Sequence, residues 1–337
     1  MKTCILHIGM HKTGTSSIQR YLDTHKEELG NKIKFASFGM SNHSGPINFL
    51  FKRDLNQSPL IRQQHLSQRD IRNRVKLYQQ YFDQSMQADF RQIIISAEAI
   101  VELNEHELSH LKERLLSHVD KIILIAYIRP PIDFMESAIQ QGLKMHQVHL
   151  DYNFLYPRYQ TRFEKFEHVF DPVEYRLFSK SSLFQGDVVA DFCQRFSINH
   201  FPYHRENESL SALAVKFLYH FQKYRLSDKI SNQDVVLIEE TLSQLDAAKF
   251  CLPTQIIDET FEHFSQDIKW IESRLGLSGE FSHISKIDRE DDLSSLNKIS
   301  ENERQQLLEL AKNKAFSEYV SRECGMTLAS FIATYFK

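Results

Sequence analysis

The longest mostly apolar run in the chain is Lys121–Ile128, which reads KIILIAYI. A run of this length without regular polar alternation is typical of a strand that is buried on both faces, as in parallel sheets. Thr3–Ile8 and Ile93–Ser96 have the same β-branched, apolar character, and Lys34–Phe38 is a shorter candidate. These runs predict the strands of a central parallel sheet.

Segments with helical spacing separate these strands. They are Ser17–Glu28, Ser67–Asp89 and Asn104–His118. Alternating strands and helices predict an α/β fold with right-handed crossovers and helices on both faces of the sheet. Glu174–Phe178 is a further expected strand. The chain after Ser211 reads as mostly helical, with helices expected at roughly Ser211–Tyr224, Asn232–Ala248, Asp258–Leu275 and Glu301–Cys324. We expect an α/β domain over residues 1–280 and a helical C-terminal extension, 281–337, packed on the same domain.

Composition narrows the functional classes. A formal net charge of −3 argues against a general nucleic-acid binder. No stretch approaches the roughly 20 apolar residues of a membrane span. The four cysteines are far apart and the 16 histidines form no H-E-x-x-H pair, so metal catalysis is not expected. Scattered, reduced thiols favour a cytoplasmic protein. The oligomeric state stays open.

The loop after the first strand has the composition of an anion-binding site. Gly9 ends the strand, and Lys12, Thr13, Gly14, Thr15 and Ser16 precede a helix. A strand, a glycine-containing loop and a helix point backbone N–H groups and the positive end of the helix dipole at an anion. The nucleotide-triphosphate loop has its lysine after the second glycine, whereas Lys12 precedes Gly14. We therefore expect a phosphate-type cradle of another kind.

The order H-x-G-x-x-K-T-G-T-S, from His7 to Ser16, resembles the 5′-phosphosulfate loop of sulfotransferases that use 3′-phosphoadenosine 5′-phosphosulfate (PAPS). A second segment, Arg129-Pro130-Pro131 followed by Ser137, resembles the family's 3′-phosphate-binding segment, and its continuation to Lys144 looks like the bacterial branch. Two weaker likenesses support it: Arg205–Ser211, which contains N-E-S-L-S, and Asp267–Gly276. Together the similarity covers roughly residues 1–279.

The resemblance implies a P-loop-like three-layer fold and a sulfuryl transfer from PAPS to an acceptor hydroxyl, which leaves 3′-phosphoadenosine 5′-phosphate. The acceptor would be a carbohydrate or another cell-surface precursor, by analogy only. Lys12 would stabilise the charge that grows on the leaving phosphate oxygen. The nucleotide-binding residues implied are His11, Lys12, Thr13, Gly14, Thr15, Ser16, Ser17, Arg129, Ser137 and Arg205. A metal is not required by this chemistry.

The acceptor hydroxyl needs a general base, and two residues compete for the role. His43 follows the second strand, and Glu98 follows the third in an I-S-A-E segment. His43 is slightly favoured, although it could merely cap a turn and Glu98 could pair with Lys12. The aromatic and histidine-rich segment His146–Tyr159 could line the acceptor cleft or simply pack in the core.

Two other functional classes remain open. A P-loop kinase for a small molecule or nucleotide is the enzyme alternative, although the displaced Lys12 argues against it. A catalytically silent protein that keeps the PAPS-binding fold is the other.

Overall fold

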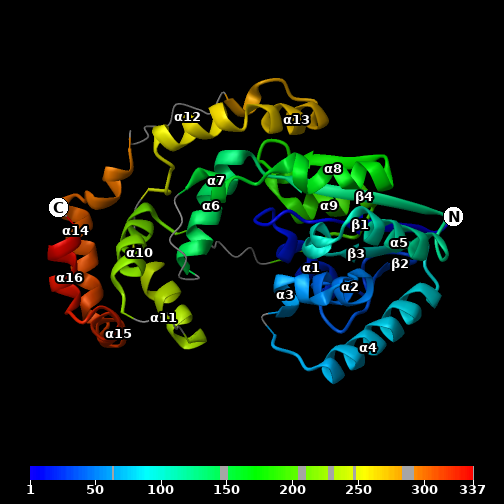
Figure 1. The fold of residues 1–337 in the computed structure, drawn as a ribbon, viewed down its shortest axis with the longest axis horizontal. Helices are drawn as coiled ribbons and strands as arrows, with labels where there is room; N and C mark the ends of the chain where they lie inside the picture. Colours follow the sequence, from blue (N-terminus) through cyan, green and yellow to red (C-terminus); the bar gives the residue numbers. More distant parts are fainter. Residues whose placement is uncertain are drawn as a thin grey trace. The chain divides into compact units, whose positions relative to one another are not determined.

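The computed structural model describes residues 1–62, 64–144, 151–203, 210–226, 231–245, 248–282 and 292–336. At its centre is a five-stranded sheet in the order β2-β3-β1-β4-β5, and every paired strand is parallel (Figure 1). The strands are β1 (Thr3–His7), β2 (Ile33–Phe35), β3 (Gln92–Ser96), β4 (Lys121–Ile128) and β5 (Val173–Leu177). The expected α/β, P-loop-like fold with a central parallel sheet is confirmed.

The middle of the sheet is apolar because its strands are covered on both faces. Ile5 of β1 pairs with Ile94 of β3, and Ile125 of β4 pairs with His7 of β1; all three isoleucines are fully buried. In the same register His7 lies opposite Ser96. Burial of β-branched side chains on both faces explains why these strands read as continuous apolar runs.

The chain divides into two compact units. The sheet unit comprises Met1–Pro130, Arg158–Arg205 and Lys269–Ser278, and the helical unit comprises Pro131–Pro157, Glu206–Ile268 and Gly279–Lys337. The boundary expected at residue 280 falls at the start of the last segment of the helical unit. That unit also contains two earlier segments, so each unit is built from separate parts of the chain.

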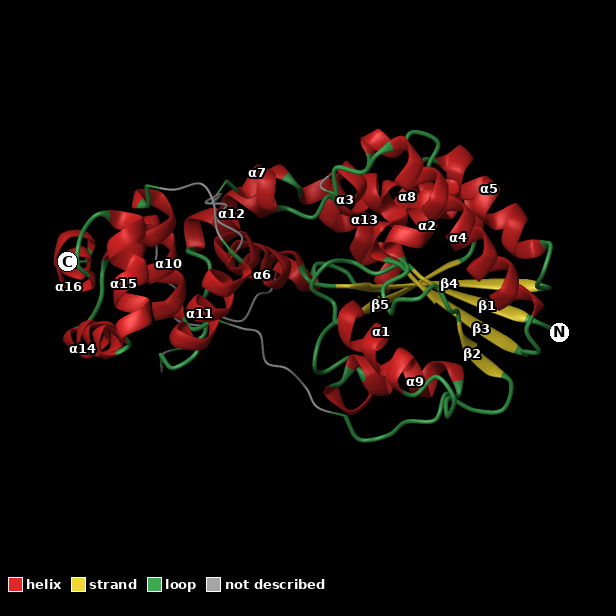
Figure 2. Cartoon of the chain, turned by 90° about the horizontal axis from the view of Figure 1, so that it is seen from below, coloured by secondary structure: helices red, strands yellow, loops and turns green. Residues whose placement is uncertain are grey.

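Helices cover both faces of the sheet within the sheet unit. Figure 2 shows α1 (Thr15–Thr24) and α9 (Val188–Phe196) on one face and α2, α4, α5 and α8 on the other. Ile18 of α1 and Phe192 of α9 pack against Ile5 and Ile125 in one apolar cluster. The second group is α2 (Ser44–Phe51), α4 (Gln68–Gln87), α5 (Glu105–Leu116) and α8 (Tyr159–Phe170), with the short α3 (Pro59–Arg62) beside them.

The helical unit has a core rich in aromatic residues. The ring of Phe217 contacts those of Phe316 and Phe331, and all three are at most 1% exposed. Its helices are α6 (Pro131–Lys144), α7 (Tyr152–Leu155), α10 (Ala212–Tyr224), α11 (Asn232–Leu242), α12 (Thr254–His263), α14 (Glu301–Glu309), α15 (Lys314–Cys324) and α16 (Leu328–Tyr335). Helix α13 (Ser265–Leu275) contains the boundary between the units, at Ile268 and Lys269. The expected largely helical C-terminal half is confirmed.

Short 3₁₀ turns connect these elements: η1 (Leu55–Gln57), η2 (Glu98–Glu102), η3 (Phe184–Gly186), η4 (Glu280–Ser282), η5 (Leu293–Asn297) and η6 (Leu310–Lys312). Among the helices that the structure describes, none is long and apolar enough to cross a membrane.

Candidate anion-binding site

Three segments of the sheet unit follow the carboxyl ends of neighbouring strands. The loop 8–14 follows β1, the turn η2 follows β3, and Arg129 follows β4. Because β1 lies between β3 and β4, these segments converge where the strand order changes direction. Open parallel sheets bind their ligands at such a point.

The loop after β1 is held in a tight conformation. Lys12 and Gly14 have φ angles of 65° and 74°, in the left-handed region. Between them, the buried Thr13 hydroxyl donates a 2.6 Å hydrogen bond to the Met10 carbonyl. A Cβ on Gly14 would lie 2.6 Å from Cγ1 of Val188, so this position requires glycine for space as well as for φ.

Gly14 ends the loop and is also the N-cap of α1, where it supplies no side-chain cap. The first N–H groups of a helix have no acceptor within the helix. Thr15 is buried in this turn, whereas Ser16 and Ser17 are exposed. The start of α1 therefore presents backbone N–H groups and hydroxyls of the kind that bind anions.

Glu98 begins η2, immediately beyond β3, and reaches the loop. Its Oε2 lies 3.0 Å from Nδ1 of His11, and its side chain is 17% exposed against 61% for His11. A carboxylate only accepts hydrogen bonds, so Nδ1 of His11 is the donor. Burial acts to raise the pKa of Glu98, but hydrogen bonds from His11 and Thr15 outweigh it, and the pKa is lowered. Glu98 is therefore a carboxylate at neutral pH.

Gly9 makes this approach of Glu98 possible. A Cβ at position 9 would lie 2.3 Å from the Thr15 hydroxyl oxygen and 2.8 Å from Cγ of Glu98. Both distances are shorter than any ordinary carbon contact. The absence of a side chain at Gly9 therefore allows the carboxylate and the first residue of α1 to meet beside the loop.

His43 occupies a different environment from Glu98. It is the N-cap of α2, its ring is fully buried, and it stacks on Phe35 with ring centres 4.4 Å apart. Its Nδ1 accepts a 3.2 Å hydrogen bond from the Ser96 N–H. Burial lowers the pKa of His43 to about 3, against a smaller opposing effect of the Ala36 backbone. The ring is therefore neutral and enclosed, and of the two candidate bases only Glu98 is partly exposed.

A buried polar network behind the loop was not predicted from the sequence. The Ser96 hydroxyl lies 2.9 Å from Nδ1 of His7, and Gln19 of α1 donates to the Ser96 carbonyl at 3.1 Å. Together with the bond to His43, Ser96 connects β1, β3, α1 and α2. The one signal in the sequence is a serine at the end of an apolar strand, two residues before Glu98.

Arg129 connects the end of β4 to the loop. Its guanidinium donates a 2.7 Å hydrogen bond to the Lys12 carbonyl, and its own carbonyl accepts a 2.6 Å bond from the Tyr159 hydroxyl. The guanidinium carbon also lies 5.8 Å from the centre of the Phe178 ring. This predicted residue thus contacts the predicted loop directly.

The other predicted residues are distributed as follows. Ser137 is partly exposed on α6, in the helical unit. Arg205, like His146 and His149 of the aromatic segment, lies outside the described residues. Tyr156, from the same segment, packs in the helical unit, where its ring stacks on Phe264 with centres 3.9 Å apart.

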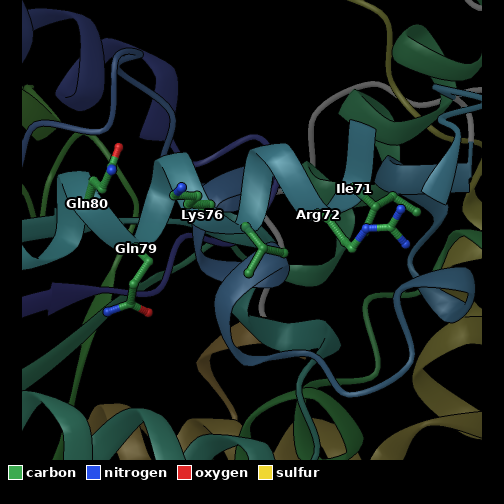
Figure 3. A pocket seen from close by; sticks show the side chains of 6 residues that line it. Ile71, Arg72, Lys76, Gln79 and Gln80 are labelled. Atoms are coloured by element: carbon green, nitrogen blue, oxygen red, sulfur yellow. The ribbon is translucent and has the colours of Figure 1, made fainter. Parts of the chain in front are cut away.

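A surface hollow of about 430 Å³ lies elsewhere, along α4 (Figure 3). It is lined by Ile71, Arg72, Val75, Lys76, Gln79 and Gln80. All six belong to one helix, and none is a predicted site residue. Within the described ranges, no group of three His, Cys, Asp or Glu side chains is placed to hold a metal ion.

Comparison with known proteins gives little further information. No protein-family model and no curated protein matches the sequence. Among solved structures, a sulfotransferase from Alicyclobacillus acidocaldarius aligns over 84% of this chain and 100% of its own, with a TM-score of 0.42 and 13% identity. A likeness this loose carries no functional argument, so the proposal below depends on the residues themselves.

Proposed function

We propose that the protein is a sulfotransferase that moves a sulfuryl group from PAPS to an acceptor hydroxyl, releasing 3′-phosphoadenosine 5′-phosphate. One observation carries the proposal: the lysine-bearing loop at the start of α1 lies beside both Glu98 and Arg129. A phosphosulfate needs hydrogen-bond donors and positive charge at this kind of loop, and the acceptor hydroxyl needs a base. The three groups are supplied by the carboxyl ends of three neighbouring strands.

In this proposal the loop binds the 5′-phosphosulfate. Backbone N–H groups of Thr13–Ser17 and the nearby hydroxyls would hold its oxygens, and Lys12 would neutralise the leaving phosphate oxygen. The bond from sulfur to that oxygen breaks as the bond to the acceptor oxygen forms. Charge grows on the leaving oxygen during this step, so a fixed cation beside it lowers the barrier. His11 would hold Glu98 at the edge of the loop.

We assign the general base to Glu98 rather than His43. The acceptor hydroxyl loses its proton as its oxygen bonds to sulfur, and a partly exposed carboxylate can accept that proton. The ring of His43 is fully buried and already accepts the Ser96 N–H. His43 would instead position the end of β3, from which Glu98 projects.

Arg129 would bind the 3′-phosphate while it holds the loop through Lys12. An arginine suits both contacts because its guanidinium presents several N–H donors in one plane. Ser137 and Arg205 are proposed for the same nucleotide on the strength of their motifs. The acceptor is proposed to be a hydroxyl of a carbohydrate or another cell-surface precursor, and the protein to act in the cytoplasm.

Ligand-induced thermal shifts test this function against its alternatives. We expect 3′-phosphoadenosine 5′-phosphate without metal to raise the melting temperature more than ATP with Mg²⁺ does. Stabilisation by ATP with Mg²⁺ alone would contradict the proposal and favour a kinase. Binding of the PAPS nucleotide without sulfuryl transfer to any of a broad acceptor panel would favour a catalytically silent protein.

A further inference from the structure

Three basic side chains gather beside η2, the turn that begins with Glu98. Lys52 donates to the Glu102 carbonyl at 2.8 Å, and Lys165 of α8 donates to the Leu103 carbonyl at 2.7 Å. The third is Arg162, one turn before Lys165 on α8. Burial, and then repulsion from Lys52 and Arg162, lowers the pKa of Lys165 to about 8.

Arg162 differs from the two lysines in its contacts. Its backbone N–H donates to the Arg158 carbonyl, but its guanidinium makes no hydrogen bond and no ion pair with a described residue, although the side chain is partly buried. Burial lowers the pKa of Arg162, opposed by the nearby Tyr159 and the Glu98 carboxylate. That carboxylate binds His11 instead. A guanidinium removed from water without a hydrogen-bonded partner is costly, so an anionic ligand would stabilise this arrangement.

Helix α8 places Arg162 at the candidate site. Residues three apart are neighbours on a helix surface, so Arg162 lies next to both Tyr159 and Lys165 on α8. The Tyr159 hydroxyl contacts the Arg129 carbonyl at the end of β4, and Lys165 contacts the end of η2. Arg162 therefore lies between the segments that follow β4 and β3. These are the two strands that flank β1 and its loop.

We propose that Arg162 binds an oxyanion carried by a substrate, either the sulfuryl group of the donor or an acidic group of the acceptor. This inference rests on the proposed sulfuryl transfer. Lys12 and Arg129 are assigned to the phosphates of the nucleotide, whereas Arg162 approaches from α8, beside Glu98. A guanidinium can hold a sulfonate, sulfate or carboxylate through two parallel N–H donors. Arg162 would thus orient the reacting groups at the base.

The two sources of the oxyanion are distinguished by comparing PAPS with 3′-phosphoadenosine 5′-phosphate, which lacks only the sulfuryl group. Calorimetric affinities are measured for the wild type, Arg162→Gln and Arg162→Lys, with Arg72→Gln, an exposed arginine on α4, as the charge-matched control. If Arg162 holds the sulfuryl group, Arg162→Gln weakens the affinity for PAPS about 10- to 100-fold, as expected for a lost charge-assisted hydrogen bond. The affinity for 3′-phosphoadenosine 5′-phosphate stays unchanged. Arg162→Lys keeps the positive charge, so its affinity for PAPS falls less than that of Arg162→Gln.

If Arg162 instead holds an acidic group of the acceptor, the ratio of the two nucleotide affinities stays unchanged in the variants. Inorganic sulfate should then raise the melting temperature of the wild-type complex with 3′-phosphoadenosine 5′-phosphate, but not that of the Arg162→Gln complex. Variants that match the wild type in both measurements would overturn the inference. A wild type that binds neither nucleotide would overturn the proposed function instead, so the two failures are distinguishable.

Discussion

The Arg129 guanidinium donates a 2.7 Å hydrogen bond to the backbone carbonyl of Lys12. Lys12 has a φ of 65°, a conformation that side-chain-bearing residues adopt at a cost of order 1 kcal/mol. The hydrogen bond helps to hold the loop in this shape and keeps the Lys12 ammonium on a defined segment beside α1. In the proposed reaction Arg129 would therefore bind the nucleotide and also shape the loop.

Replacing Lys12 should affect the reaction much more than the fold. We expect Lys12→Ala to lower the rate of sulfuryl transfer about 10²- to 10³-fold, the usual effect of removing one preorganised donor from a developing oxyanion. The melting temperature should change little, because the structural contact of Lys12 with Arg129 uses the backbone carbonyl. Lys76→Ala, at an exposed lysine on α4, is the control. Full transfer activity in Lys12→Ala would contradict the assignment.

Glu98→Gln should remove the general base while keeping a side chain of similar size. Transfer should slow by about 10²- to 10⁴-fold, the range for general base catalysis. The base must be deprotonated and its pKa is lowered, so wild-type activity should fall only in acid, below the ordinary glutamate range. The variant should lack this acidic limb. A pH–rate profile with an unchanged acidic limb in Glu98→Gln, but a missing one in His43→Asn, would return the role to His43.

The sequence was most informative where one local pattern determined the structure. The expected strand Lys121–Ile128 and β4 have the same bounds, because an apolar run between polar ends reports burial directly. The sequence also predicted where the strands end, and therefore that the loop with Lys12, Glu98 and Arg129 follow strand ends. Parallel strands end at one edge of the sheet, so residues far apart in the chain could be expected to converge.

Features that depend on packing between distant segments could not be predicted. His43 reads as a loop histidine, but Asn42 caps the Ser44 N–H and a helix starts at once, which carries the ring onto Phe35. Pro46 lies in the first turn of this helix, where proline is tolerated. Arg162 belongs to no recognisable sequence motif, because the segments near it in space, η2 and the end of β4, are distant in the sequence.

Two predictions of helix boundaries were wrong for a related reason. The expected helix Asp258–Leu275 is two helices with Phe264 between them, and its first part begins earlier, at Thr254. The expected helix Glu301–Cys324 is interrupted where the Asn313 side chain caps a new helix by accepting the Phe316 N–H. Apolar spacing continues across both interruptions, so the periodicity alone does not reveal them.

Gly9→Ala should destabilise the sheet unit and disturb Glu98. The added methyl would lie 2.3 Å from the Thr15 hydroxyl oxygen and 2.8 Å from Cγ of Glu98, so the loop must shift. We expect a loss of about 1–3 kcal/mol in the free energy of unfolding, typical of overpacking, measured by urea denaturation. Gly45→Ala is the matched control, since a Cβ there meets nothing within 4 Å and the residue lies in helix α2. Equal stability of the two variants would refute this role of Gly9.

The burial of two neutral histidines should make the protein less stable in mild acid. The pKa of His43 is lowered from 6.5 to about 3 and that of His7 to about 4, both chiefly by burial. Between about pH 6 and pH 4 the unfolded chain binds these protons and the folded protein does not, so the free energy of unfolding falls as the pH falls. Each histidine contributes up to about 1.4 kcal/mol per pH unit.

His43→Asn tests this linkage, because asparagine can still accept the Ser96 N–H but does not titrate. The variant should be less stable than the wild type at pH 7, since it loses the stacking on Phe35. Its free energy of unfolding should then decline less steeply between pH 6 and pH 4, by up to about 1.4 kcal/mol per pH unit. His106→Asn, at an exposed histidine of α5, controls for the loss of a histidine. An unchanged slope in His43→Asn would mean that His43 takes up its proton in the folded protein, which would make it available again as a base.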